Sequence, residues 1–168
     1  MAITHTGNFV NSTLLIEQLG LEPHPEGGFF KRTYTAASDT SVAGKTARPY
    51  MTSIFYLLEA NAPVGRMHSN RSDIVHYWQG GGALRYTLIS PDGEFEQIVM
   101  GANLAAGEQL QLTVKGGWWK ASELISGEYG LISEAVCPGF DYADHQFASP
   151  HLIQSLCPLH WQDIKHLC

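Results

Sequence analysis

The sequence predicts an all-β sandwich or barrel. About eight short strand-like runs follow one another at intervals of roughly ten residues, and turn signals separate them. The chain has 17 glycines and only 15% charged residues, which favours tight turns and a largely apolar interior. Its 168 residues suit one domain, 1–168, and no internal repeat, linker or low-complexity segment divides it.

Two short helices are predicted, one near each end of the chain. Asn11 or Ser12 can cap the first helix, which runs to Leu19, and Gly20 stands where a C-cap glycine belongs. The second helix covers residues 159–167. Because helices this short are marginal alone, we expect them to pack on the strands.

The segments expected to form strands are rich in β-branched and aromatic residues or alternate polar and apolar residues. They cover residues 29–34, 52–58, 73–78, 83–90, 94–100, 109–114 and 129–137. Residues 23–28 contain two prolines and two glycines and predict a stiff loop that carries His24 and Glu26. Residues 36–49 are small and polar and predict a long surface loop.

Composition and charge exclude several classes of partner. The net charge is −6 and no basic stripe occurs, which argues against nucleic acid. No apolar run approaches the roughly 20 residues of a membrane helix, and residues 1–20 lack the pattern of a signal peptide. The three cysteines are odd in number and lack metal-type spacing, so we expect reduced thiols and a cytoplasmic protein.

Residues 66–80 gather charged and titratable side chains in a chain that has few of them. His68 is followed by four residues and Asp73, and Asp73 is followed by six residues and Gly80. This spacing resembles the second half of the first cupin motif, in which a histidine and a carboxylate from neighbouring strands point into a small β-barrel. Arg66 stands where that motif has a further histidine, and Asp73 where it usually has Glu.

Five segments together resemble the cupin_5 family (DUF985) over about residues 13–148. They are residues 24–30, 52–58, the stretch around His68 and His76, 91–93, and 138–141. The resemblance implies a double-stranded β-helix (the cupin jelly roll), commonly in a homodimer. It brings no established reaction, and its likeness to sugar-nucleotide epimerases of the rhamnose pathway is one of fold only. We therefore expect a homodimer with a small-molecule ligand.

A metal centre needs three or four converging nitrogen and oxygen ligands. His68 and Asp73 are two candidates, and Glu26 or His24 is a third. The second cupin motif should add a histidine, but Lys120 stands in its place, and an ammonium group repels a divalent cation. The sequence therefore predicts a protein without a metal or another cofactor.

The leading hypothesis is metal-independent isomerase or epimerase chemistry on a small polar or sugar-like ligand. His68 would be the base, Asp73 would orient it, and Glu26 would be the acid. Cationic side chains would bind an anionic group or stabilise an enolate-like charge. The residues expected to contact the ligand are His24, Arg32, Arg66, His76, Tyr86 and Lys120.

Two alternative functions stay open. A non-catalytic cupin would bind its ligand in an apolar pocket where tryptophans such as Trp78 and Trp118 stack on a sugar or a planar ring. A metal-dependent cupin enzyme is the third candidate. A close histidine–carboxylate pair in a water-filled pocket would favour an enzyme.

Strand alternation separates two residues of the central stretch. Asp73 and His76 fall on opposite faces of the predicted strand. With Asp73 pointing into the barrel, His76 is expected to be a structural or interface histidine. His145, like His5, His151, His160 and His166, is expected at the surface or near an end of the chain.

Overall fold

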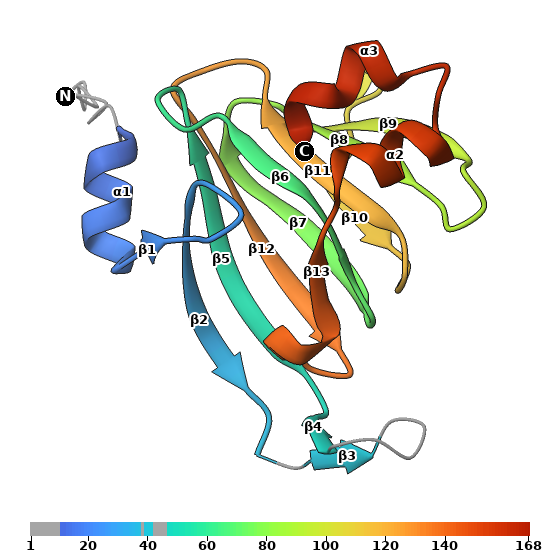
Figure 1. The fold of residues 1–168 in the computed structure, drawn as a ribbon. Coiled ribbons are helices and arrows are strands. Elements are labelled where there is room, and N and C mark those ends of the chain that lie inside the picture. Colours follow the sequence, from blue (N-terminus) through green and yellow to red (C-terminus); the bar gives the residue numbers. More distant parts are fainter. Residues whose placement is uncertain (1–10, 38, 42–46) are drawn as a thin grey trace, which may run out of the picture.

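The structure is a computed structural model that describes residues 11–37, 39–41 and 47–168. Two antiparallel sheets face each other, and a small two-stranded ribbon projects from one end (Figure 1). Short helices lie near both ends of the chain. The predicted all-β jelly roll is therefore confirmed.

The larger sheet has the spatial order β1 (Glu22–Pro23), β2 (Phe29–Thr35), β5 (Thr52–Glu59), β12 (Tyr129–Cys137), β7 (Asp73–Gly81) and β10 (Gln111–Val114). The smaller sheet has the order β13 (His145–Phe147), β6 (Val64–Asn70), β11 (Trp119–Leu124), β8 (Leu84–Ile89) and β9 (Phe95–Met100). The ribbon pairs β3 (Asp39–Ser41) with β4 (Ala47–Pro49). Most neighbours are distant in sequence, so the barrel brings remote segments together.

The predicted strands are present, with ends that shift by a few residues. Outside the ribbon, four further strands, β1, β6, β11 and β13, were not predicted. The inward positions of β6 and β11 carry polar residues such as His68, Lys120 and Ser122, so these two strands lack an apolar run. The other two, β1 and β13, have only two and three residues. The ribbon lies within the predicted loop 36–49, of which residues 38 and 42–46 are outside the described part of the chain.

The helix α1 (Ser12–Leu19) has the predicted caps. The Asn11 side chain accepts a hydrogen bond from the Leu14 N–H, and Gly20 adopts the left-handed conformation with φ of 61°. Near the other end, α2 (Pro150–Leu156) was not predicted, and the expected helix at 159–167 is α3 (Trp161–Ile164) followed by the 3₁₀ turn η3 (Lys165–Leu167). Two more 3₁₀ turns are η1 (Leu104–Ala106) and η2 (Tyr142–Asp144). None of the helices in the described ranges is long and apolar enough to cross a membrane.

Alternation divides the side chains of the smaller sheet between two cores. Met67, Ile89 and Trp119 pack with Ile153 of α2 and Ile164 of α3 in one buried cluster. These two helices lie over the smaller sheet (Figure 1). Tyr86 and Leu88 point inward and pack against the larger sheet. The space between the sheets is thus an apolar core at one end, and polar side chains line the pocket described below.

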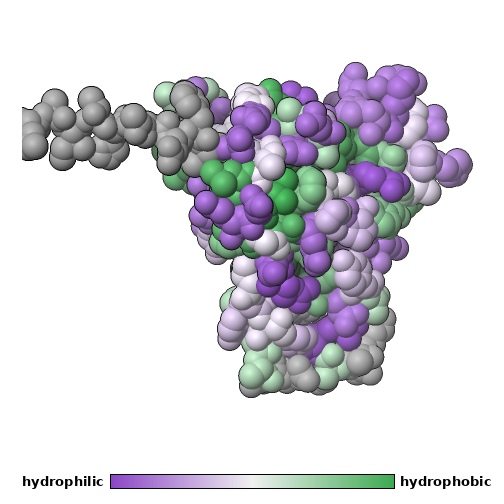
Figure 2. Space-filling view, turned by 90° about the vertical axis from the view of Figure 1, so that its left-hand side faces the viewer, coloured by the Kyte–Doolittle hydropathy of each residue, from purple (hydrophilic) through white to green (hydrophobic). Residues whose placement is uncertain are grey.

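The side of the molecule that carries α1 and β2 has a mixed surface. Hydrophilic residues surround a small hydrophobic patch in this view (Figure 2).

The homodimer that the family resemblance implies stays a prediction.

Candidate functional site

A pocket opens between the inner faces of the two sheets. Its empty volume is about 450 Å³, counting the open space at its mouth. The apolar lining residues are Phe30, Ile54, Ile74, Val136 and Phe140. The polar and aromatic lining residues are His24, Glu26, Arg32, Thr52, Tyr56, His68, Asn70, Lys120, Glu134 and Tyr142. The apolar walls and buried titratable groups are the ordinary features of a small-molecule site.

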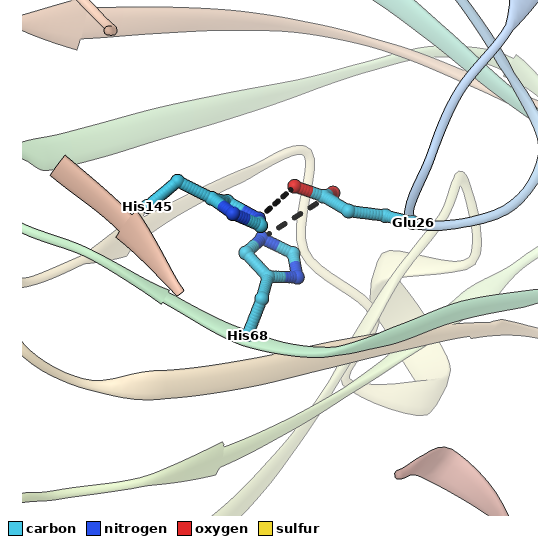
Figure 3. Close-up of side chains that lie close together, drawn as sticks. All are labelled: Glu26, His68 and His145. Atoms are coloured by element: carbon cyan, nitrogen blue, oxygen red, sulfur yellow. Dashed lines mark hydrogen bonds and ion pairs between the residues drawn. The ribbon is translucent and has the colours of Figure 1, made fainter. Parts of the chain in front are cut away.

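Glu26 and His68 line this pocket, and His145 meets them from a third element to form the carboxylate–histidine centre (Figure 3). Glu26 comes from the β1–β2 loop, His68 from β6 and His145 from β13. Glu26 Oε1 lies 2.8 Å from His145 Nε2, and Glu26 Oε2 lies 3.4 Å from His68 Nε2. The three candidate ligand atoms all lie within 4.8 Å of one another.

The loop that carries Glu26 is locked to two strands. The Arg66 N–H donates to the Glu26 carbonyl at 2.7 Å, and the Tyr56 hydroxyl donates to the Gly27 carbonyl at 2.9 Å. Gly28 has a φ of 66°, and a Cβ there would collide with the Leu57 carbonyl. The glycines that predicted a stiff loop therefore allow a close approach that fixes the carboxylate in place.

A backbone contact sets the tautomer of His68. Its Nδ1 lies 2.7 Å from the Arg66 carbonyl oxygen, which can only accept, so Nδ1 donates. In the neutral ring, Nε2 then carries a lone pair, and this buried atom has no hydrogen-bond partner. The lone pair faces the Glu26 carboxylate, which is also an acceptor. A cation between them, either a proton or a metal ion, would remove this conflict.

The ionisation states of the centre follow from burial and from neighbouring charges. Burial lowers the pKa of His68 to about 4. The Glu26 charge raises this pKa, and the Lys120 charge lowers it further. Burial raises the pKa of Glu26, but His68, the hydrogen bond from His145 and the Lys120 charge outweigh it and leave a pKa of about 2. At neutral pH the carboxylate is ionised and the His68 imidazole is neutral.

A second buried cluster joins the two sheets beside the centre. Lys120 Nζ lies 2.8 Å from His76 Nε2 and 3.4 Å from Glu134 Oε1, and the imidazole nitrogen lies 3.2 Å from the same carboxylate oxygen. Lys120 is on the smaller sheet, whereas His76 and Glu134 are cross-strand partners on the larger sheet. Burial raises the pKa of Glu134, but Lys120 and His76 outweigh it and lower the pKa. Burial and the Lys120 charge lower the pKa of His76.

The structure brings together five of the nine residues that the sequence placed at the site. These five, which line the pocket, are Glu26, His68, His24, Arg32 and Lys120. Arg32 is exposed on β2 and lies 5.7 Å from the centre of the Phe140 ring. The Glu26 N–H donates to His24 Nδ1 at 3.2 Å, and burial lowers the pKa of this histidine despite the Glu26 charge.

Three of the remaining predicted residues act from outside the pocket. The exposed Arg66 side chain stacks on Phe147, with its guanidinium carbon 4.9 Å from the ring centre, so only its backbone reaches the site. Tyr86 is fully buried behind the pocket and makes an edge contact with the His76 ring. His76 is itself fully buried in the Lys120–Glu134 cluster.

The predicted orientation of the strand at 73–78 is wrong. Asp73 is exposed and accepts a hydrogen bond from the Gly116 N–H at 2.7 Å, so it does not orient His68. His76 points into the barrel instead. The alternation itself holds, but a strand with one titratable residue on each face does not reveal which face is inward.

Glu134 and His145, which complete the two clusters of the site, were not predicted. Glu134 lies in a predicted strand at an alternating position whose neighbours, Ile132 and Val136, are buried, so a carboxylate on that inward face was the available signal. His145 was expected at the surface, yet its side chain is 7% exposed and bonds to Glu26. The residues that flank His145 carry no pattern that predicts this contact. The tryptophans expected to stack on a ligand are absent from the described lining of this pocket.

Comparison with protein families gives one match. Residues 13–148 match the family model described as "Cupin superfamily (DUF985)". An uncharacterised protein of Saccharomyces cerevisiae, YML079W, is 39% identical over 147 residues, which cover 79% of this chain and 73% of the yeast protein.

Solved structures share the fold. A hypothetical protein from Leishmania major has a TM-score of 0.87 at 27% identity and covers 95% of this chain and 99% of its own. Protein SO0799 from Shewanella oneidensis has a TM-score of 0.84 at 30% identity, with coverage of 94% and 97%. Oxalate decarboxylase from Bacillus subtilis has a TM-score of 0.55 at 14% identity and covers 87% of this chain and 36% of its own, so this likeness concerns the fold alone.

Proposed function

Because this chain belongs to the Cupin_5 family (DUF985) of the cupin superfamily, we propose that it is an enzyme whose pocket isomerises or epimerises a small polar molecule at the carboxylate–histidine centre, with the help of a divalent metal ion. The observation that carries this proposal is the buried His68 Nε2, whose lone pair faces the Glu26 carboxylate without a hydrogen bond. A site built only for packing would leave no such conflict between two acceptors.

The three side chains fit a divalent cation. The 3.4 Å between His68 Nε2 and Glu26 Oε2 falls in the range of roughly 3.0–3.4 Å expected for neighbouring ligands about 2.1 Å from an ion. The 2.8 Å between His145 Nε2 and Glu26 Oε1 is a hydrogen-bond distance, and a metal ion would replace that bond. The hydrogen bond from His68 Nδ1 to a carbonyl is the outer contact that metal-binding histidines ordinarily make. Two imidazoles and one carboxylate suit zinc, manganese, nickel or non-haem iron.

The ionisation states agree with the geometry. Metal ligands must be deprotonated, and Glu26 and His68 already are at neutral pH. A general base works best when its pKa lies near the working pH, which is well above that of either group. The Lys120 charge that argued against a metal is partly offset by Glu134, 3.4 Å away.

The roles of the residues follow from their positions. Bound metal would polarise a carbonyl oxygen of the ligand and so acidify the neighbouring C–H bond. Lys120 would stabilise negative charge on an oxygen. Glu134 is the pocket carboxylate left to accept the proton, and because Lys120 and His76 lower its pKa, it would be a weak base that depends on the metal to acidify the C–H bond. Phe30, Ile54 and Phe140 exclude water from the reacting atoms.

A metal-free mechanism is the second candidate, and the bare His68 Nε2 favours it. In this mechanism the imidazole removes the proton from the ligand, and Lys120 stabilises the resulting charge. Glu26 then serves as an ionised partner rather than the acid predicted from sequence, because its pKa is about 2. The cytoplasmic location and the homodimer stay predictions under either mechanism.

Elemental mass spectrometry of tag-free protein, purified without chelator, separates the two candidates. We expect about one equivalent of metal per chain, and a loss of most of it in H68Q and in H145Q. The matched control is H151Q, which removes an exposed histidine on α2. Metal far below one equivalent in the wild type would overturn the metal-assisted form.

Turnover is tested by exchange of carbon-bound hydrogen in D₂O, followed by NMR over a panel of hydroxy-carbonyl compounds, sugar nucleotides and small acids. We expect exchange in the wild type and in H151Q, and none in H68Q. Ligand binding without exchange for every compound that binds would favour the non-catalytic cupin.

A further inference from the structure

Lys120 places a buried positive charge beside the carboxylate–histidine centre. It is 5% exposed, lines the pocket and is the cross-strand partner of His68. Directly paired residues on neighbouring strands have Cβ atoms about 5 Å apart, so the ammonium group and the His68 ring share one stretch of the pocket wall. His76 and Glu134 engage Lys120 from the opposite sheet and leave one of its three N–H donors for a ligand.

The charges of the pocket indicate the charge of its ligand. Two carboxylates, Glu26 and Glu134, and one ammonium group, Lys120, line the pocket, so their formal charges sum to −1. A divalent cation at the centre would turn this into one net positive charge. Buried charge is costly unless it is compensated, so a ligand with a single negative charge would neutralise the interior. Arg32, at the exposed end of the lining, favours the same sign.

Asn70 adds a second requirement. Its side chain is 8% exposed and lines the same pocket, and its Oδ1 is buried without a hydrogen-bond partner. Asn70 follows His68 by two residues on β6, so both side chains point to the inner face. A buried acceptor of this kind calls for a donor, and a hydroxyl group supplies one.

We propose that the pocket binds a small 2-hydroxy acid, with its carboxylate at Lys120 and its hydroxyl group at Asn70. Asn70 is the diagonal neighbour of Lys120 across the β6–β11 pair, at a separation of about 7–8 Å between the two positions. An acid whose carboxylate and hydroxyl are on neighbouring carbons spans this separation with one hydrogen bond at each end. This substrate class rests on the metal-assisted function proposed above. It narrows the small polar molecule to a carboxylic acid with a hydroxyl group on the next carbon.

Three probes that differ by one group each test this class. Isothermal titration calorimetry is run on metal-loaded protein with racemic lactate, with propionate, which lacks the hydroxyl, and with 1,2-propanediol, which lacks the carboxylate. We expect lactate to bind about tenfold more tightly than propionate, since a lost hydrogen bond to a buried acceptor costs about that factor. The diol should not bind measurably. Equal affinities for lactate and the diol would overturn the proposal.

Variants of the two recognition residues separate charge from direct contact. N70A should reduce the affinity for lactate to that for propionate and leave propionate unchanged. E134Q removes one negative charge and should tighten both acids severalfold. K120M/E134Q keeps the net charge but removes the donor, so it should weaken both acids about tenfold. The matched control is K31M, which removes an exposed lysine.

The metal content of every variant distinguishes failure of the proposed substrate class from failure of the proposed metal-assisted function. None of these substitutions changes Glu26, His68 or His145, so all variants should hold about one metal per chain when they are loaded with excess metal. E134Q removes the offset to the Lys120 charge and should therefore bind the metal more weakly than the wild type does. Full metal loading with no preference for lactate would overturn the substrate class and leave the metal-assisted function intact. A wild type without metal would overturn both.

Discussion

Lys120 on β11 and His68 on β6 are directly opposite each other, so the buried cation of the pocket stands beside the imidazole whose Nε2 has no hydrogen-bond partner. The pair places a charge and a lone pair on the same inner wall. Glu134 and His76 approach from the other sheet and hold the ammonium group in place. The Lys120 cluster therefore joins the two sheets and also lines the pocket.

Removing Lys120 alone should destabilise the protein strongly. K120M leaves Glu134 buried without its ammonium partner, and an uncompensated buried charge costs about 3–5 kcal/mol of unfolding free energy. The double variant K120M/E134Q should recover most of this loss, because it removes both charges. Urea unfolding of the wild type, both single variants and the double variant measures the coupling. Additive losses would show that the two charges do not interact.

Stability should fall on acidification below the ordinary pKa of histidine. The pKa values of His76 and Glu134 are lowered in the fold, so the unfolded chain binds more protons than the folded chain below their ordinary pKa values of 6.5 and 4.5. Their contributions are fully present above about pH 6.5 and decline as the pH falls through the folded pKa values. The measurement is urea unfolding of the protein across this pH range, with a chelator present so that metal binding does not contribute. E134Q should flatten the decline below pH 4.5, whereas H151Q should follow the wild type at every pH.

Arg48 should support the segment that carries His145. The Arg48 Nε donates to Asp144 Oδ2 at 2.9 Å, one residue before His145. R48M should therefore lower the melting temperature and reduce the metal bound per chain, because β13 loses an anchor. R85M is the matched control, since Arg85 lies 3.9 Å from Glu123 in a more exposed pair. An unchanged metal content in R48M would show that pairing of β13 with β6 positions His145 without this anchor.

Gly28 should tolerate no side chain. G28A combines a φ of 66° with a collision against the Leu57 carbonyl and should cost several kcal/mol of unfolding free energy. G107A is the control, because Gly107 also has a positive φ, of 85°, but nothing lies within 4 Å of its added Cβ. This variant should cost about 1 kcal/mol. Equal losses in urea unfolding would mean that strain in φ, not the close approach, decides the effect at Gly28.

The sequence by itself determined the fold class, most strands of the larger sheet and the stiff loop at residues 23–28. Alternation, turn residues and glycines act over a few neighbouring positions, so they can be read locally. The same local logic placed His24 and Glu26 on a stiff loop, and the resemblance to the cupin motif identified His68 as a pocket residue. The strands β6 and β11 were not predicted because their inward positions are polar. A binding site inside a barrel requires such polar positions.

Only the tertiary structure decided which residues complete the centre. Glu26 and His145 are 119 positions apart in the chain, and their contact depends on β13 pairing with β6 at the edge of the smaller sheet. Pairing also decided which face of β7 points inward. The pairing of β7 with β12 and β10 turns His76 into the barrel and Asp73 out of it. Strand pairing between distant segments sets these neighbours, and alternation along one strand is the same whichever face is buried.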